Sequence, residues 1–395
     1  MDPIEVEYEP TSVKLVLAEM KDTSELIIDL AYSAVLHGGE EMAEEVLELE
    51  AHMDVLQLRA RMSLLLAART PEDAETLAPV LGVVGAAEKI SNAAGEIAQA
   101  VLSESGIPDE IRAALPEALE TMVRAKVHRD SPFCDMTLGG LNMETDTGIR
   151  VIAIRRKGKW IYNPGPEERI SLEDVVLLRG SEENLADVYE NVTISEYKLT
   201  EYVESELVDL ERAVDSIVLM KNMSELAVDL AYGAILFNSE DVAEEVFELE
   251  AEVDALQSRF EAWTLRAAAS VEDPIRLRGL VHLARATEEI SDAALEIADG
   301  VLRGIASHPI VAEAVQVSDE IIIRITLGPG CDLDGKTLGE CNLSSETGMR
   351  ILAIRRFNTA EWVVSPDSET ELKSGDVLVA KGTRLGAERV AILTS

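Results

Sequence analysis

The segment TLGGLNMETDTGIRVIAIRR spans residues 137–156, and a closely similar segment, TLGECNLSSETGMRILAIRR, spans residues 337–356. Other stretches match at the same offset of 200 positions: MKDTSELIIDLAYSAVL (20–36) matches MKNMSELAVDLAYGAIL (220–236), and AEEVLELEAHMDVLQLR (43–59) matches AEEVFELEAEVDALQSR (243–259). The offset grows to 202 at Trp160 and Trp362, so the second copy carries a two-residue insertion in a turn. Such self-similarity indicates a tandem duplication of a unit of about 200 residues.

Each copy begins with a helical pattern. Apolar residues step by three and four, as they do along one face of an α-helix. These residues are Val46, Leu49, Met53, Leu56 and Ala60, with the equivalents Val246, Leu249, Val253, Leu256 and Phe260. Turn signals such as Gly38-Gly39 and helix starts such as Thr70 before Pro71 divide this part of the chain. The pattern predicts three or four antiparallel helices, packed as a bundle, in each copy.

Short apolar runs follow from residue 120 onward. In the first copy they occupy residues 150–155, 160–162 and 175–178, and in the second copy they read ILAIR, EWVV and DVLVA. Glycine and proline separate the runs, as is typical of strands joined by turns. Each copy is therefore predicted to be a helical bundle followed by a small α+β domain.

The predicted α+β domains share a motif. In the first copy it consists of Leu138, Gly139, Asn142, Gly148, the strand 151–156, Pro164, Asp174 and Gly180. In the second copy it consists of Leu338, Gly339, Asn342, Gly348, the strand 351–356, Pro366, Asp376 and Gly382. In these residues and their spacing both copies resemble the C-terminal ligand-sensing (RCK_C) domain of TrkA-type regulators of potassium conductance. The resemblance implies domains that pair and, in some members, bind cyclic di-AMP or another small ligand between them.

The helical parts repeat a Glu-x-x-x-Asp pair, which is the mark of PhoU domains, and they resemble that family. The pairs are Glu25/Asp29, Glu50/Asp54, Glu225/Asp229, Glu250/Asp254 and Glu288/Asp292. Glu88/Asn92 departs from the pattern. We therefore expect a multidomain α and α+β chain in which PhoU-like bundles (1–120 and 191–310) alternate with TrkA C-terminal (RCK_C) domains (121–190 and 311–395).

The acidic pairs are candidate ligands of a divalent metal. Carboxylates at positions i and i+4 lie on one helix face, so pairs from neighbouring helices can converge on a cation. In PhoU proteins such pairs hold surface metal clusters. The alternative is a solvated acidic surface, because a chain this acidic contains about 14 such pairs by chance alone. All ten residues of the five pairs remain candidates.

Four polar residues beside the apolar strand are candidates for a small-ligand site. Asn142, Arg150, Asn342 and Arg350 could donate hydrogen bonds to a polar molecule. Two copies in one chain could pair with each other and form the site on a pseudo-twofold axis, or the chain could form a homo-oligomer. The alternative roles are a turn cap for the asparagine and a surface ion pair for the arginine. Arg155 and Arg156, at the end of the same strand, fit salt bridges at least as well as ligand contacts.

The chain carries 75 Asp and Glu against 35 Lys and Arg, which gives a net charge of −40. That charge excludes mainly electrostatic binding of nucleic acid or of anionic lipid. Lysine is scarce, with 11 residues against 24 arginines. This composition is typical of proteins from a salt-rich cytoplasm, and we expect a halophilic, haloarchaeal type; an acidic mesophilic protein is the alternative.

Cysteine use and hydropathy indicate the compartment. Cys134, Cys331 and Cys341 form no CxxC pair, which indicates a reducing environment. No apolar run of about 18 residues occurs that would span a membrane. We therefore expect a cytoplasmic protein, peripheral to the membrane through a transporter.

The predicted function is that of a soluble, ligand-sensing regulator of potassium or other cation transport, whose partner is a membrane channel or transporter. The alternative is a PhoU-type regulator of phosphate transport, or a metal-binding protein that uses the acidic pairs. We expect no enzyme activity, because the sequence contains no nucleophile constellation, P-loop or GxGxxG loop. The candidate bound groups are the small ligand, such as cyclic di-AMP or another nucleotide, and the divalent metal.

Overall fold

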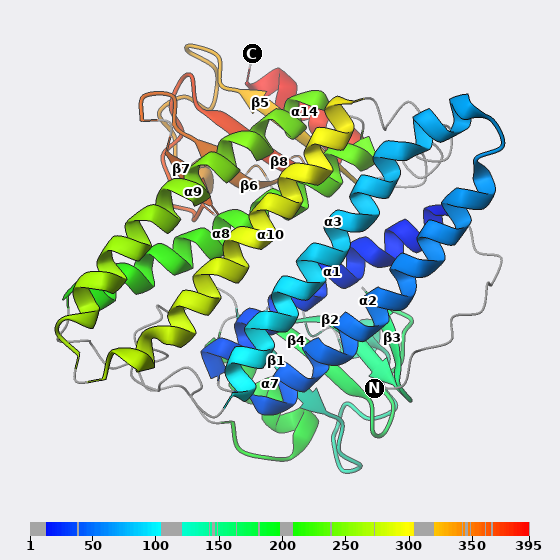
Figure 1. Ribbon diagram of the computed structural model, residues 1–395. Helices are drawn as coiled ribbons and strands as arrows, with labels where there is room; N and C mark the ends of the chain where they lie inside the picture. The colour runs from blue at the N-terminus through cyan, green and yellow to red at the C-terminus, as the bar shows by residue number, and fades with distance from the viewer. Residues whose placement is uncertain are drawn as a thin grey trace.

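The computed structural model describes residues 13–103, 121–197, 208–303 and 320–394, apart from residues 38, 142, 144–146, 148, 163, 181, 238, 272, 342, 344–346, 348, 360 and 365. Within these ranges the chain alternates long helices with small sheets, and does so twice (Figure 1). The predicted fold class is confirmed. Each bundle has three described long helices.

The first bundle contains α1 (Val13–His37), α2 (Glu40–Ala67) and α3 (Pro71–Leu102). The second contains α8 (Val208–Phe237), α9 (Glu240–Ala268), the short 3₁₀-helix η1 (Pro274–Leu277) and α10 (Arg278–Leu302). Thr70 begins α3 with a capping box, since its side chain accepts from the backbone N–H of Asp73 and the Asp73 carboxylate accepts from that of Thr70. This cap fixes the turn that follows α2.

The predicted helical seams are buried. All ten seam residues of α2 and α9 are at most 3% exposed, and they belong to one apolar core that runs through the six long helices. The two bundles meet along α3 and α10 and along α1 and α8. The chain is thus a pseudo-dimer held together by its helices.

The first α+β domain contains β1 (Thr121–Lys126), α5 (Leu138–Leu141), β2 (Arg150–Arg156), β3 (Lys159–Tyr162), β4 (Val175–Gly180) and α7 (Glu182–Thr193). The second contains β5 (Glu320–Thr326), α12 (Leu338–Cys341), β6 (Met349–Arg355), β7 (Trp362–Val364), β8 (Val377–Thr383) and α14 (Arg384–Leu393). The strand orders, β1-β4-β2-β3 and β5-β8-β6-β7, are equivalent, and every pairing is antiparallel.

Each sheet has two differently covered faces. In the first sheet, Met122, Ala153 and Leu177 pack into the core of the helical bundles. Val123, Ile154 and other residues of the opposite face form a separate core with α7. The sheet is therefore a layer between its bundle and its own short helix, so a shift of the sheet must disturb the packing of α1 and α2.

The two α+β domains lie on opposite sides of the helical layer, the first below it and the second above it in Figure 1. The predicted pairing of these domains within one chain is therefore not seen among the described residues, and the ligand site between paired domains stays a prediction. The reason is the packing of the bundles: α3 and α10 join the two copies at the centre, and each sheet is held against its own bundle on the outside.

Candidate functional site

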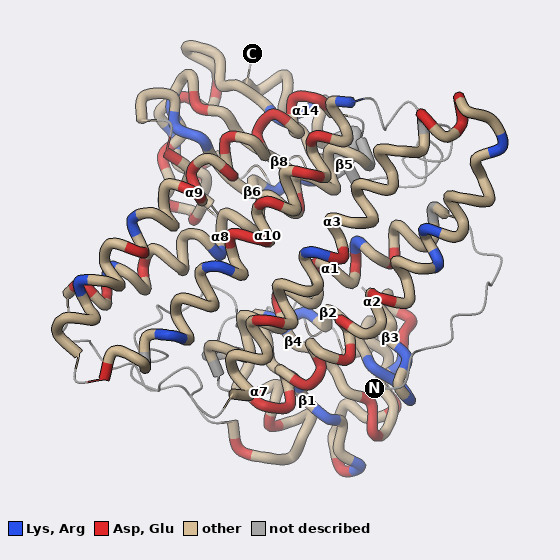
Figure 2. The backbone as a smooth tube through the Cα atoms, viewed as in Figure 1, with Lys and Arg blue, Asp and Glu red and all other residues tan. Residues whose placement is uncertain are grey.

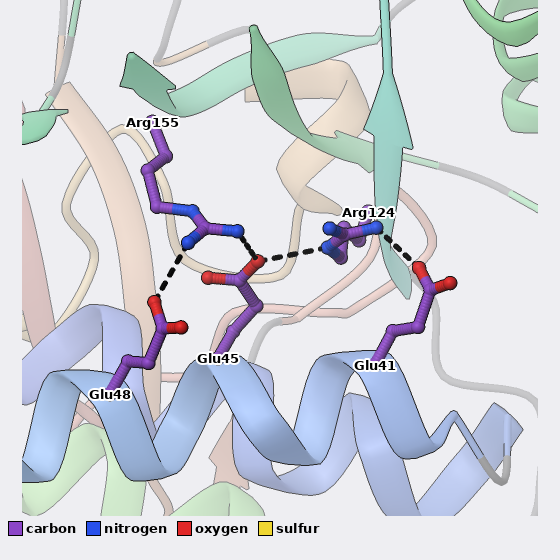
Figure 3. Close-up of polar contacts among 5 residues, drawn as sticks. All are labelled: Glu41, Glu45, Glu48, Arg124 and Arg155. Carbon is purple, nitrogen blue, oxygen red and sulfur yellow. Dashed lines mark hydrogen bonds and ion pairs between the residues drawn. The ribbon is translucent and has the colours of Figure 1, made fainter. Parts of the chain in front are cut away.

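A buried carboxylate joins each sheet to its bundle (Figure 3). Glu45 on α2 is only 3% exposed, and Arg124 of β1 donates from Nε to its Oε1 at 3.0 Å. Arg155 of β2 donates to the same oxygen from Nη2. Each arginine also donates to a more exposed carboxylate of α2. Arg124 donates to Glu41, and Arg155 Nη1 donates to Glu48 Oε2 at 2.7 Å. We call this group, Glu41, Glu45, Glu48, Arg124 and Arg155, the first clamp.

The second copy has an equivalent second clamp with fewer contacts. Arg324 of β5 donates from Nε to Glu245 Oε1 at 2.5 Å, and Arg355 of β6 donates to the same oxygen at 3.0 Å. The outer pair, Arg355 with Glu248, is 3.9 Å apart. Asp241, one methylene shorter, stands where the first copy has Glu41. The second clamp therefore depends mainly on Glu245.

Glu45 and Glu245 are not among the residues predicted from the sequence, and for Arg155 and Arg156 the prediction was a salt bridge with no named partner. Arg156 indeed pairs with Asp174 at 2.8 Å. A signal for Glu45 exists in the helical pattern, because it lies between Met42 and Leu49 at three- and four-residue steps, on the buried face. A charged residue on an apolar seam, repeated in both copies, indicates a buried partner of opposite charge.

A second group of charges lies where α1 meets α8 and where the ends of β4 and β8 approach them. Arg179 of β4 donates to Asp29 at 3.1 Å. Burial raises the pKa of Asp29 to about 6, and Arg179 opposes this shift. Burial raises the pKa of Asp229 to about 7, helped by the charge of Glu25 from the other copy and opposed by cations that include Lys381 of β8.

This central charge cluster contains four carboxylates and four cations. The carboxylates are Glu25, Asp29, Glu225 and Asp229, and the cations are Lys21, Lys221, Arg179 and Lys381. Hydrogen bonds between the copies flank it, one between the hydroxyls of Ser24 and Tyr232 at 3.1 Å and one between those of Tyr32 and Thr287 at 2.7 Å. The four predicted metal ligands of α1 and α8 thus meet cations of the chain itself. The cluster connects one sheet to the other through the pseudo-twofold axis.

The predicted acidic pairs of α9 and α10 face one another. Burial raises the pKa values of Glu250, Glu288 and Asp292, and the charge of Asp254 adds to each shift. In the first bundle burial likewise raises the pKa of Glu50, and Asp54 and Glu96 add to the shift. Asn92 replaces one acid there, and Glu88 pairs with Arg61 at 3.3 Å.

Across the described ranges, no three carboxylate, histidine or cysteine side chains gather as a metal site. Glu250, Asp254, Glu288 and Asp292 therefore lie at the same α9–α10 interface, but among the described residues they do not form a group of three or more that could bind a metal ion. These residues match a divalent cation in chemical type, since all of them are carboxylates.

The predicted small-ligand residues are only partly described. Asn142 and Asn342 lie outside the described residues. Arg150 and Arg350 are exposed at the starts of β2 and β6, opposite Arg179 and Lys381 in the strand register. Directly opposed residues share a face of the sheet. Arg150 and Arg350 therefore lie at the rim of the interfaces with the bundles, next to the strand residues that reach the central charge cluster.

The architecture defines the chain as a duplicated two-domain protein in which each α+β domain is fastened to a helical bundle. Two sequence profiles match it: the PhoU domain at residues 17–101 and 217–301, and the TrkA-C domain at residues 122–193 and 322–391. The chain belongs to the proteins that combine PhoU and TrkA-C domains in tandem. These domains indicate a regulatory role in potassium transport or in a phosphate-related process.

Three solved structures illustrate the similarity. PhoU from Pseudomonas aeruginosa is 14% identical with a TM-score of 0.42, over 74% of this chain and 96% of that one. The RCK_C domain dimer of S. agalactiae BusR in complex with c-di-AMP is 28% identical with a TM-score of 0.18, over 19% of this chain and 97% of that one. The GsuK RCK domain is 16% identical with a TM-score of 0.19, over 75% and 71%. No curated protein matches the sequence.

Hydropathy along the helices gives one further result. In the part of the chain that the structure describes, no helix combines the length and the apolar character needed to cross a bilayer.

Proposed function

We propose that the protein is a cytoplasmic regulator of potassium or other cation transport, in which the TrkA-C domains sense a small ligand and the PhoU bundles act on a membrane channel or transporter. The presence of both domain types, twice, supports this proposal. The protein acts by binding, without catalysis, because its sequence offers no activated nucleophile or positioned base.

The observation that carries the proposal is the continuity between each sheet and its bundle. The clamp carboxylates are buried and bind two strands at once, and the sheet shares its apolar core with the helices. A ligand that displaces a sheet must therefore shift α1 and α2, or α8 and α9. Such a ligand acts only if it binds one arrangement more tightly than the other.

The ligand site lies between TrkA-C domains of two chains. The two domains of one chain are on opposite sides of the helical layer, so each needs a domain from a second copy to pair with. Homo-oligomers with twofold interfaces are common, and pairing of this kind places equivalent residues around one ligand. Cyclic di-AMP is the first candidate, and Arg150, Arg350, Asn142 and Asn342 are the residues proposed to contact it.

Isothermal titration of the full chain in molar KCl tests the ligand, with cyclic di-AMP, ATP and NADH injected in turn. The proposal expects saturable heat with one of them, and weaker binding after Arg150→Ala with Arg350→Ala. Lys159→Ala, which removes an exposed cation from β3, is the matched control and should leave the affinity unchanged. Absence of heat and of a shift in thermal stability with all three compounds would remove the ligand sensor from the proposal.

A second candidate function is regulation of phosphate transport, or metal binding, through the acidic pairs. The observation that favours it is the approach of the carboxylates of α9 and α10, whose charges raise one another's pKa values. Metal analysis of the purified protein separates the two candidates. Two or more tightly held transition-metal ions per chain would favour the second candidate.

A further inference from the structure

Positively charged side chains gather where the two copies meet, although the chain is strongly acidic. Acids outnumber lysines and arginines along each of the six long helices (Figure 2). The central charge cluster nevertheless contains as many cations as carboxylates, four of each. Lys21 and Lys221 come from α1 and α8, whereas Arg179 and Lys381 come from β4 and β8. The sheets therefore supply half of the positive charge in the cluster.

Each of the two sheet cations neutralises a carboxylate of its own copy. Arg179 donates to Asp29 at 3.1 Å, and the Asp29 side chain is only 18% exposed. Lys381 lies close enough to Asp229 that its charge lowers the pKa of that carboxyl, against the effect of burial. β4 and β8 hold the same place in the strand order of their sheets. A sheet that leaves its bundle therefore withdraws one cation from the cluster.

The charges of the two copies act on one another across the cluster. The pKa of Asp29 on α1 responds to the charges of Glu225 and Lys221 on α8. The pKa of Asp229 on α8 responds in turn to Glu25 and other charged groups of α1. The carboxylates and cations of both copies thus form one charge balance, and a change at one sheet alters the field at the cation of the other sheet.

The apolar contacts of the sheets connect each of them to its own bundle. β1 packs against α1, whereas β5 packs against α8 and α9, and β7 packs against α8. Ile322 of β5 lies directly over Gly233 of α8, where an added Cβ atom would come within 2.5 Å of the Ile322 Cδ1. Among the described residues, the central charge cluster is therefore the most direct connection between the two sheets.

The sign of this connection follows from the count of charges. With both sheets in place, four cations face four carboxylates; with one sheet displaced, three cations remain. Because opposite charges attract and like charges repel, the remaining sheet cation then faces a net negative group and no longer the repulsion of its counterpart. We propose that the two sheets are negatively coupled through the central charge cluster, so that displacement of one TrkA-C domain from its bundle strengthens the attachment of the other.

The functional consequence rests on the proposed function. A ligand that displaces one TrkA-C domain of a chain makes displacement of the second domain of that chain more difficult. The coupling is reciprocal, because it is a free energy shared by the two sites. The chain therefore responds to ligand mainly through one of its two sheets at a time.

Hydrogen exchange of the full chain without ligand tests the coupling, because displacement of a sheet exposes its strand amides. The measurement is made at about pH 8.5, where Asp29 and Asp229, with pKa values of about 6 and about 7, are ionised. The KCl concentration is the lowest at which circular dichroism shows the native helix content. In Arg179→Gln the amides of β1 and β4 should exchange faster than in the wild type, and those of β5 and β8 about threefold slower.

Asp29→Asn is a second variant that should change the second sheet in the opposite direction. It removes a carboxylate instead of a cation, so Lys381 is held by less negative charge and the amides of β5 and β8 should exchange about threefold faster. Arg179→Lys keeps the cation and should leave these amides unchanged. Lys159→Gln, the matched control, removes an exposed cation of β3 outside the cluster and should also leave them unchanged. Both changes should shrink in molar KCl, because the screening length falls to about 3 Å.

The proposal is overturned if Arg179→Gln leaves the amides of β5 and β8 unchanged or makes them exchange faster. It is also overturned if Arg179→Gln and Asp29→Asn change the second sheet in the same direction, as a loss of packing would, or if Lys159→Gln protects it as much. No ligand is present in these measurements. Their outcome is therefore independent of ligand binding, and the proposed function is tested separately.

Discussion

The two clamps should respond differently to the loss of one charge. Removing one partner of a buried ion pair costs about 3 to 5 kcal/mol when the other charge stays buried and unpaired. In the first clamp Arg124 and Arg155 keep Glu41 and Glu48, so Glu45→Gln should cost about 1 kcal/mol. In the second clamp Glu245 is the short-range partner of both arginines, which are themselves partly exposed to water. There we expect Glu245→Gln to cost about 2 kcal/mol.

Hydrogen exchange of the strand amides measures this difference, because opening of a sheet from its bundle exposes them. At about 1.4 kcal/mol for each tenfold change, amides of β5 and β8 should exchange about 30-fold faster in Glu245→Gln. Amides of β1 and β4 should exchange about fivefold faster in Glu45→Gln. Glu48→Gln, an exposed member of the first clamp, is the control and should change exchange by about twofold or less. Equal effects of Glu45→Gln and Glu245→Gln, or an effect of Glu48→Gln as large as either, would refute the reasoning.

Three other predictions concern stability and metal content. Burial raises the pKa of Asp29 to about 6 and that of Asp229 to about 7, whereas a carboxyl in the unfolded chain has a pKa near 4. Between these pH values the folded state binds more protons than the unfolded state. The free energy of unfolding should therefore fall as the pH rises from about 4 to about 7. Urea midpoints at the two ends of this range should show a shallower fall in Asp229→Asn; an unchanged slope would contradict the assignment. Tyr162→Phe removes the 3.0 Å hydrogen bond from Thr23 and should lower the free energy of unfolding by about 1 kcal/mol in urea titrations, and no change would mean that the bond contributes nothing. Mass-spectrometric metal analysis should find fewer than one tightly bound transition-metal ion per chain, and the acidic pairs would regain their predicted role if two or more were found.

The elements could be predicted where the pattern is periodic and apolar. The seam of α2 and α9 and the strands β2, β3 and β4 are found close to their predicted bounds. β1, TMVRAK, was missed because Arg124 interrupts its apolar pattern, and that arginine points at a buried carboxylate instead of water. A charged residue that is buried through pairing looks like a surface residue in the sequence alone.

The arrangement of the domains could not be predicted, because periodicity shows which face of an element is buried but not what covers it. The partners of Glu25 and Asp29 illustrate this limit. As an i,i+4 pair they looked like metal ligands, yet Lys21 bonds Glu25 at 2.6 Å and Arg179 reaches Asp29 from a strand 150 positions away. The cations that neutralise them come from the tertiary fold.

The central claim is that the chain acts on a cation transporter, and co-purification from native membranes in molar KCl tests it most directly. The full chain would be isolated with its membrane partners, and these would be identified by mass spectrometry. The account predicts a potassium or other cation channel or transporter subunit in stoichiometric amount. A phosphate transporter in that position, or a pool of the protein free of any membrane partner, would contradict it.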